Sequence, residues 1–200
     1  MENGDRRTAQ RDGLLLVAAL AALMWLVEVV DQVLGGRLDR YGIEPHNVDG
    51  LAGIVSAPFL HAGWGHLIGN TIPFLALGAV IALSGVARVA AVTAIVAVVG
   101  GLGTWLVAPA GTDHIGASGI VFGYASYLIA RGAFSRRPVH LLAGVVVLAI
   151  YGATLLVSLV PADGISWQGH LFGAVGGVAA ARALDAARRA PAVAGAPRLS

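Results

Sequence analysis

Six apolar segments make up most of this 200-residue chain, and five of them approach the length of a membrane-spanning helix. A helix needs about 20 mostly apolar residues to cross a bilayer. The candidate segments cover residues 14–34, 64–84, 89–108, 118–130, 139–160 and 167–184. The fourth segment is too short to cross alone, so we expect it to start below the membrane surface, where a loop dips into a protein-lined cavity.

The composition supports a membrane protein. Hydrophobic residues make up 57% of the chain and charged residues 12%, against roughly 45–50% and about 25% in soluble proteins. A soluble domain of this size could not bury so much apolar surface, and disorder is excluded on the same ground. The net charge is only +2 and no arginine cluster forms a large patch, which excludes nucleic acid as a partner. The chain has no cysteine, so disulfides and thiolate chemistry are also excluded.

Arginine supplies every basic residue, and its distribution predicts the orientation in the membrane. Only Arg37 and Arg40 lie on the side of the membrane where the chain emerges from the first segment. The other side holds Arg6, Arg7, Arg11, Arg88, Arg131, Arg136, Arg137, Arg182, Arg188, Arg189 and Arg198. Because positive charge accumulates on the cytoplasmic side, we expect both termini to be cytoplasmic. Arginine in place of lysine, with abundant Ala, Gly and Val, favours a bacterial source and hence the inner membrane.

These features predict one all-α membrane domain, a bundle of six transmembrane helices over residues 14–185. Residues 1–13 are expected to form a cytoplasmic tail, and 186–200 a disordered cytoplasmic tail. A long external loop, residues 35–63, follows the first helix, and loops of this length are usually functional. A cleaved signal peptide is an alternative for the first segment, although its apolar core exceeds the usual length of about 7–15 residues. The oligomeric state stays open.

Polar residues occur in three apolar segments, and polar groups inside a bilayer are costly and tend to be functional. The predicted orientation makes these three segments run in the same direction, from outside to inside. Their polar side chains then lie at one depth near the external end of the bundle. These side chains are His66, Asn70, Ser118 and His170.

A nucleophilic serine explains this convergence. The hydroxyl of Ser118 needs a neighbouring base to take its proton, and His170 can supply one if the fourth and sixth segments pack closely. Small residues on both segments allow such packing: Gly119, Gly123, Gly169, Gly173 and Gly177. Ser118 also begins a helix, where free N–H groups can stabilise an oxyanion. Since no acidic residue is suitably placed, we expect a dyad rather than a triad.

The order of three motifs resembles that of the rhomboid intramembrane serine proteases. The motifs are His61-x4-His66-x3-Asn70, Gly116-x-Ser118-Gly119 and His170-x2-Gly173-x3-Gly177. The resemblance implies the six-helix minimal form of that fold and cleavage of the transmembrane segments of other membrane proteins near their external end. It implies Ser118 as nucleophile, His170 as general base, and no metal or cofactor. It further implies that His66 and Asn70 contribute to the oxyanion hole and that His61 supports the first loop.

The chain departs from the family pattern at three places. Many members carry a Trp-Arg pair where this chain has Ala52 and Gly53, a Tyr where it has Phe122, and some a Glu where it has Ala82. Phe122 can still stack on the catalytic histidine. These changes affect the rigidity of the first loop and the choice of substrate, and they leave the dyad intact.

The predicted site is a hydrophilic pocket open to the outside, since water must reach Ser118. Its expected lining is Asn70, His66, His114, Ser118, Gln168 and His170. Substrates should carry Gly, Ser, Ala or Pro near the cut, because these residues weaken a helix. We expect substrate to enter past the fifth segment, with residues 161–166 as a lid.

Several alternatives remain open at this stage. The main one is a non-catalytic rhomboid-like protein that binds or escorts membrane clients, although such proteins usually lack the serine or the histidine. A transporter would show a charge or an inverted repeat at the midplane. A metal site built from His61, His66 and His170 would lack an acidic ligand. Ser118 could be a helix cap and His170 a buried neutral histidine, and His114 is a second candidate base.

Overall fold

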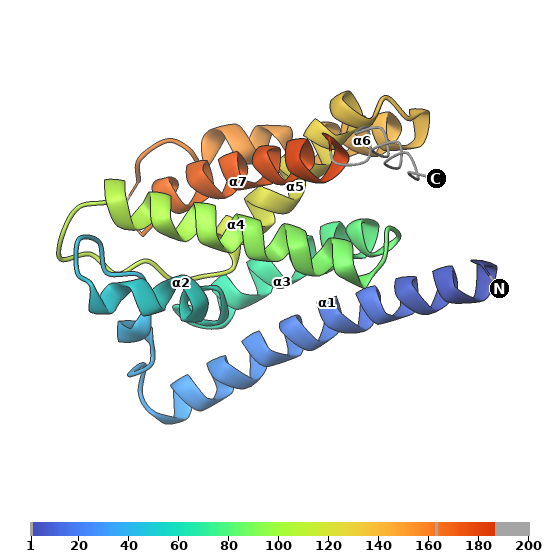
Figure 1. The fold of residues 1–200 in the computed structure, drawn as a ribbon. Coiled ribbons are helices and arrows are strands. Elements are labelled where there is room, and N and C mark those ends of the chain that lie inside the picture. The colour runs from blue at the N-terminus through green and yellow to red at the C-terminus, as the bar shows by residue number, and fades with distance from the viewer. Residues whose placement is uncertain (1, 163, 187–200) are drawn as a thin grey trace, which may run out of the picture.

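The computed structural model describes residues 2–162 and 164–186, and these residues form helices with no strand. The helices are α1 (Glu2–Val33), α2 (Gly53–Ser56), α3 (Trp64–Ala82), α4 (Val86–Val107), α5 (Ser118–Ser135), α6 (Pro138–Val157) and α7 (Trp167–Ala186). Three short 3-10 helices also occur: η1 (Asp39–Tyr41), η2 (Asp49–Ala52) and η3 (Ala57–Phe59). The prediction of an all-helical fold is confirmed (Figure 1).

Four of these helices are long and apolar enough to cross a membrane: α1, α3, α4 and α6. The chain is therefore a multi-pass membrane protein by length and composition. Helices α5 and α7 carry more polar residues, and they form the most extensive helix pair of the bundle. Helix α7 also packs extensively on α4, and α5 on α6 (Figure 1). The polar helices α5 and α7 are therefore in contact with other helices over much of their surface.

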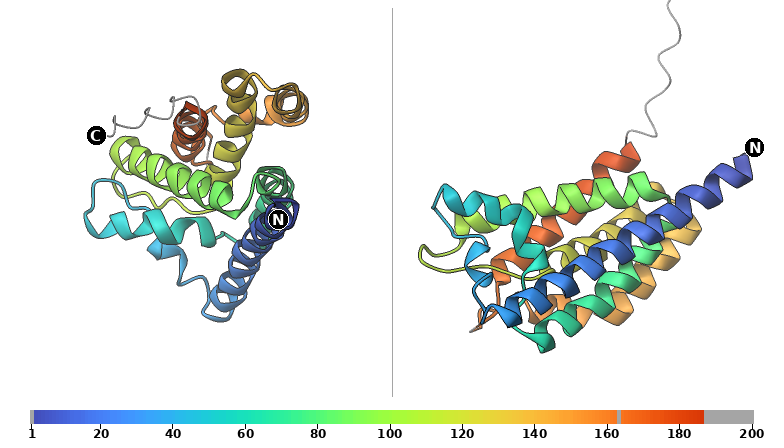
Figure 2. Two further views of the ribbon diagram at one scale, coloured as in Figure 1. Left: turned by 45° about the vertical axis from the view of Figure 1, so that its right-hand side comes forward. Right: turned by 90° about the horizontal axis from the view of Figure 1, so that it is seen from below.

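The start of α1 and the end of α7 lie at the same end of the bundle (Figure 1). The opposite end holds the connection between α1 and α3 together with the connections α4–α5 and α6–α7 (Figures 1 and 2). The core between the ends is apolar, and Phe74 stacks on Tyr124 within it. The bundle thus has one end rich in connecting segments, which is where the predicted site residues lie.

Helix α1 begins earlier than the hydropathy suggests. Residues 2–13, for which the sequence predicts a tail, continue this helix from Glu2. This polar stretch contacts the turn between α3 and α4. Gln10 donates a hydrogen bond of 2.8 Å to the carbonyl of Leu83, and Ala9 lies beside Gly85. The predicted disordered tail falls almost wholly on residues 187–200, which lie outside the described part of the chain.

The connection between α1 and α3 is folded rather than irregular, since η1, η2, α2 and η3 occupy much of it. Its backbone packs on itself, because a Cβ atom on Gly53 would collide with the carbonyl oxygen of Gly42. Ile43 also exchanges two backbone hydrogen bonds with His114, of 2.9 and 3.0 Å. Close backbone packing thus leaves no room for a side chain at Gly53, one of the two positions at which the chain departs from the Trp-Arg pair of the motif pattern.

Candidate active site

Ser118 and His170 come together from separate helices at the end of the bundle that carries the long connections. Ser118 is the first residue of α5, and His170 lies in the first turn of α7. The distance between Ser118 Oγ and His170 Nε2 is 2.9 Å. A Cβ atom on Gly173 would collide with the carbonyl oxygen of Gly119, so only glycine permits this approach of α7 to α5. The close approach lets a short serine side chain reach the imidazole.

Two further contacts hold the ring of His170. Its Nδ1 atom lies 2.9 Å from the carbonyl oxygen of Ser158, at the end of α6. Because a carbonyl can only accept a hydrogen bond, Nδ1 carries the proton and the lone pair of Nε2 faces Ser118. The ring also stacks on Phe122, with centroids 4.2 Å apart and planes 7° apart. The Ser158 carbonyl thus occupies the place that an acid holds in a triad.

His66 and Asn70 lie on α3 and line the same cavity as Ser118 and His170. Nδ1 of His66 accepts a hydrogen bond of 3.3 Å from the Ala62 amide, which leaves the ring proton on Nε2. Asn70 is only 6% exposed, and its Nδ2 atom has no hydrogen-bond partner. Both residues therefore present N–H donors beside the serine, as an oxyanion requires.

Gly116 brings the backbone before Ser118 against His66. Its φ angle is +109°, in the region that favours glycine. A Cβ atom at this position would lie 2.7 Å from Nε2 of His66 and 2.6 Å from its Cε1. Both the conformation and the space therefore require glycine here.

His61 lies beneath the site, with only 1% of its surface exposed. Its Nε2 atom is 3.4 Å from the Ala117 amide, and its ring meets that of His66 edge to face at 5.1 Å. Burial is the main cause that lowers the pKa of His61 to about 4, with a smaller effect from His66. The ring is therefore neutral at pH 7 and can accept the amide hydrogen bond next to Ser118.

The cavity in front of the dyad has a volume of about 670 Å³. Five of the six predicted lining residues border it: His66, Asn70, His114, Ser118 and His170. Gln168 is buried and does not border it, so that prediction is wrong. Gln168 is two residues from His170, and such neighbours point to different sides of a helix.

His114 links two connections across the cavity. Its Nδ1 atom lies 2.7 Å from Ser166 Oγ and its Nε2 atom 2.9 Å from Thr112 Oγ1. Burial lowers the pKa of His114, while Asp113 opposes this shift. Both ring nitrogens thus meet hydroxyl groups other than that of Ser118, which disfavours His114 as a second base.

Sequence reasoning missed the Ser158 carbonyl and the Ser166 hydroxyl. No residue type indicates a backbone carbonyl, so Ser158 left no signal. Ser166 immediately precedes α7 and accepts a hydrogen bond of 3.3 Å from the Gly169 amide, and a serine before a helix is a recognisable cap. Within residues 2–162 and 164–186, no group of three or more His, Cys, Asp or Glu side chains could hold a metal ion.

Comparison with known proteins identifies the family of this chain. The rhomboid domain matches residues 49–186. Uncharacterized proteins of Mycobacterium tuberculosis and Mycobacterium bovis are 46% identical over 181 residues, which cover 86% of this chain and 75% of theirs. A Bacillus subtilis protein, YdcA, whose name assigns it provisionally to the rhomboid proteases, is 29% identical over 125 residues, 62% of each chain. The chain therefore belongs to the rhomboid family.

Proposed function

We propose that this protein is an intramembrane serine endopeptidase in which Ser118 is the nucleophile and His170 the general base. The observation that carries the proposal is the 2.9 Å contact between Ser118 Oγ and His170 Nε2, in a ring whose other nitrogen donates to the Ser158 carbonyl. Membership of the rhomboid family agrees with this chemistry. Serine and histidine in this arrangement are the minimum needed for acyl transfer.

The reaction follows from these positions. Nε2 of His170 takes the proton of Ser118 as Oγ attacks the carbonyl carbon of the scissile amide. The resulting tetrahedral intermediate collapses when His170 gives that proton to the leaving amine, and an acyl-enzyme remains on Ser118. Water from the cavity then attacks the ester, with His170 again acting as base.

His66 and Asn70 are proposed to stabilise the oxyanion of this intermediate, together with the amide of Ser118. The Ser118 amide lies at the start of α5, where N–H groups lack partners within the helix and the helix dipole is positive. The buried Nδ2 of Asn70 has no partner in the resting protein, so a developing negative charge would supply one.

The site is proposed to open on the external face of a bacterial inner membrane. The arginines concentrate at the opposite end of the bundle, which predicts cytoplasmic termini, and the six apolar segments predict six membrane crossings. The mycobacterial relatives agree with a bacterial source. At this depth the enzyme would cut the transmembrane segments of other proteins near their external end, after local unwinding of the substrate helix.

Helix α6 is the proposed gate for these substrates. Only Gly144 and Val147 are buried in this helix, which packs mainly on α5. The connection that follows α6 holds Ser166, whose hydrogen bond to His114 crosses the cavity. Movement of α6 and this connection would open a lateral path to Ser118.

A cleavage assay tests the proposal. The full chain is reconstituted in proteoliposomes with a single-span model substrate, and Ser118→Ala should abolish product formation. Ser126→Ala is the matched control, because this serine lies on the same helix and bonds to the carbonyls of Gly123 and Ala174 rather than the cavity. Wild-type cleavage by Ser118→Ala would refute the mechanism. Substrate binding without any cleavage by the wild-type protein would favour the client-binding alternative.

A further inference from the structure

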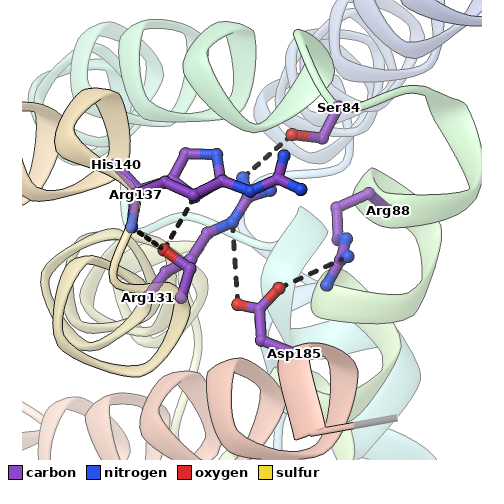
Figure 3. Close-up of polar contacts among 7 residues, drawn as sticks. Ser84, Arg88, Arg131, Arg137, His140 and Asp185 are labelled. Carbon is purple, nitrogen blue, oxygen red and sulfur yellow. Dashed lines mark hydrogen bonds and ion pairs between the residues drawn. The ribbon is translucent and has the colours of Figure 1, made fainter. Parts of the chain in front are cut away.

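A second polar cluster lies at the arginine-rich end of the bundle, far along α5 from Ser118. Arg88 of α4 and Arg131 of α5 both contact the carboxylate of Asp185 on α7, at 3.6 and 3.7 Å (Figure 3). All three side chains are buried, and Arg131 also donates a hydrogen bond of 2.9 Å to Ser84. Two guanidinium groups thus share the carboxylate of Asp185.

A cavity of about 570 Å³ adjoins this cluster on the side of Arg131. Arg6 of α1, together with Arg137 and His140 beside the start of α6, adds further cationic or hydrogen-bonding groups to its wall. No carboxylate borders the cavity within the described part of the chain. The remaining wall is largely apolar, with Ala9, Val80, Leu83, Leu128, Val139 and Ala143. The cavity therefore combines a cationic lining with an apolar one.

Ser135 orders the backbone at Arg137 and the ring of His140 at the start of α6. Ser135 Oγ accepts a hydrogen bond of 3.4 Å from the Arg137 amide and lies 2.8 Å from Nδ1 of His140. Figure 3 shows Arg137 and His140 beside Arg131. Helix α6 begins at Pro138, so the positive end of its dipole also faces this region. An anion in the cavity would meet guanidinium, imidazole and helix-end groups together.

We propose that this cavity binds the phosphate group of an anionic membrane lipid. Guanidinium groups recognise phosphate by paired hydrogen bonds, and basic pockets between helices at the cytoplasmic surface suit lipid headgroups. Three guanidinium groups, those of Arg6, Arg131 and Arg137, line the cavity, and no carboxylate of the described residues does, which favours an anion over a zwitterion. The apolar wall suits the glycerol and upper acyl carbons of a lipid better than a soluble phosphate. The proposal does not depend on the chemistry of Ser118 and His170.

Two double variants of equal charge test the site. Arg6→Gln with Arg137→Gln removes two arginines that line the cavity. Arg7→Gln with Arg136→Gln removes their immediate neighbours, which do not line it. All four arginines are exposed, so both variants should fold like the wild-type protein. Equal thermal stability without added lipid verifies this.

Binding is measured by native mass spectrometry of the full chain in a neutral detergent. Phosphatidylglycerol is titrated in one arm, phosphatidylcholine in the second and inorganic phosphate in the third. We expect one tightly held phosphatidylglycerol, about tenfold weaker in the Arg6/Arg137 variant and nearly unchanged in the Arg7/Arg136 variant. Equal weakening in both variants, or equal binding of phosphatidylcholine, would overturn the site. Displacement of the lipid by millimolar inorganic phosphate would overturn the lipid as its natural ligand.

Discussion

The ring of Phe122 lies face to face with the ring of His170, with centroids 4.2 Å apart and planes 7° apart. Phe122 lies on α5, the helix that begins with Ser118, and His170, the proposed base, lies on α7. The stack fixes the plane of the imidazole, while the Ser158 carbonyl fixes its rotation. Together they keep Nε2 directed at Ser118 before any substrate arrives.

Phe122→Ala should lower kcat about tenfold with little change in KM, because an aromatic stack stabilises by about 1 kcal/mol and its loss frees the imidazole to turn. Phe122→Tyr keeps the ring and should retain most of the activity. Both values come from initial rates of cleavage in proteoliposomes. Equal rates for the alanine variant and the wild-type enzyme would show that the stack does not position His170.

Asn70→Ala should lower kcat about 100-fold, the usual cost of removing one oxyanion donor. The melting temperature should change little, because Nδ2 of Asn70 makes no hydrogen bond in the resting protein. This combination separates a role in the transition state from a role in folding. A large loss of thermal stability with an unchanged kcat would assign Asn70 to the structure alone.

Gly116→Ala should destabilise the protein and displace His66. The left-handed conformation costs an alanine about 1–2 kcal/mol, and the added methyl group would also collide with the imidazole. Gly111→Ala is the matched control, since Gly111 also has a positive φ angle, +75°, but nothing lies within 4 Å of its Cβ position. Thermal unfolding should show the larger loss for Gly116→Ala, and only this variant should lose activity. Equal losses would mean that the contact with His66 is unimportant.

The connection between α1 and α3, which contains Asp39, should become less stable as the pH rises towards about 6. Burial, with the nearby charges of Asp31 and Glu28, raises the pKa of Asp39 from 3.8 to about 6. A raised pKa means that the folded state holds the proton more tightly, so this stabilisation is present below pH 3.8 and is lost above about 6. Asp39→Asn should therefore raise the melting temperature at pH 7.5 more than at pH 4.

Asp49→Asn makes the same charge change at an exposed position of the same connection. It serves as the control for net charge, and we expect no comparable gain in melting temperature at pH 7.5. If both variants stabilise the protein equally at that pH, the effect comes from overall charge and not from the half-buried position of Asp39.

The starts of the helices that carry the site followed closely from sequence. Trp64, Ser118 and Trp167 begin α3, α5 and α7, at the positions where the predicted apolar segments begin. The pattern of apolar residues within each segment is therefore enough to predict where these three helices begin. The start of α1 did not follow from it, because residues 2–13 are polar and their contacts come from Leu83 and Gly85.

The side chains of the candidate site were also accessible to sequence reasoning, since polar groups are conspicuous in apolar segments. Ser118, His170, His66 and Asn70 lie around one cavity. Two features were not accessible. The Ser158 carbonyl carries no mark in the sequence, and the exclusion of Gln168 from the cavity depends on the rotation of α7 about its axis.

Labelling with a fluorophosphonate probe tests the central claim most directly, because such probes react only with a serine whose hydroxyl is activated. The full-length protein is treated in proteoliposomes and the modified peptide is identified by mass spectrometry. We predict a single adduct on Ser118 that is lost in His170→Ala and kept in the control variant His140→Ala. An adduct on another serine, or equal labelling of Ser118 without His170, would contradict the account.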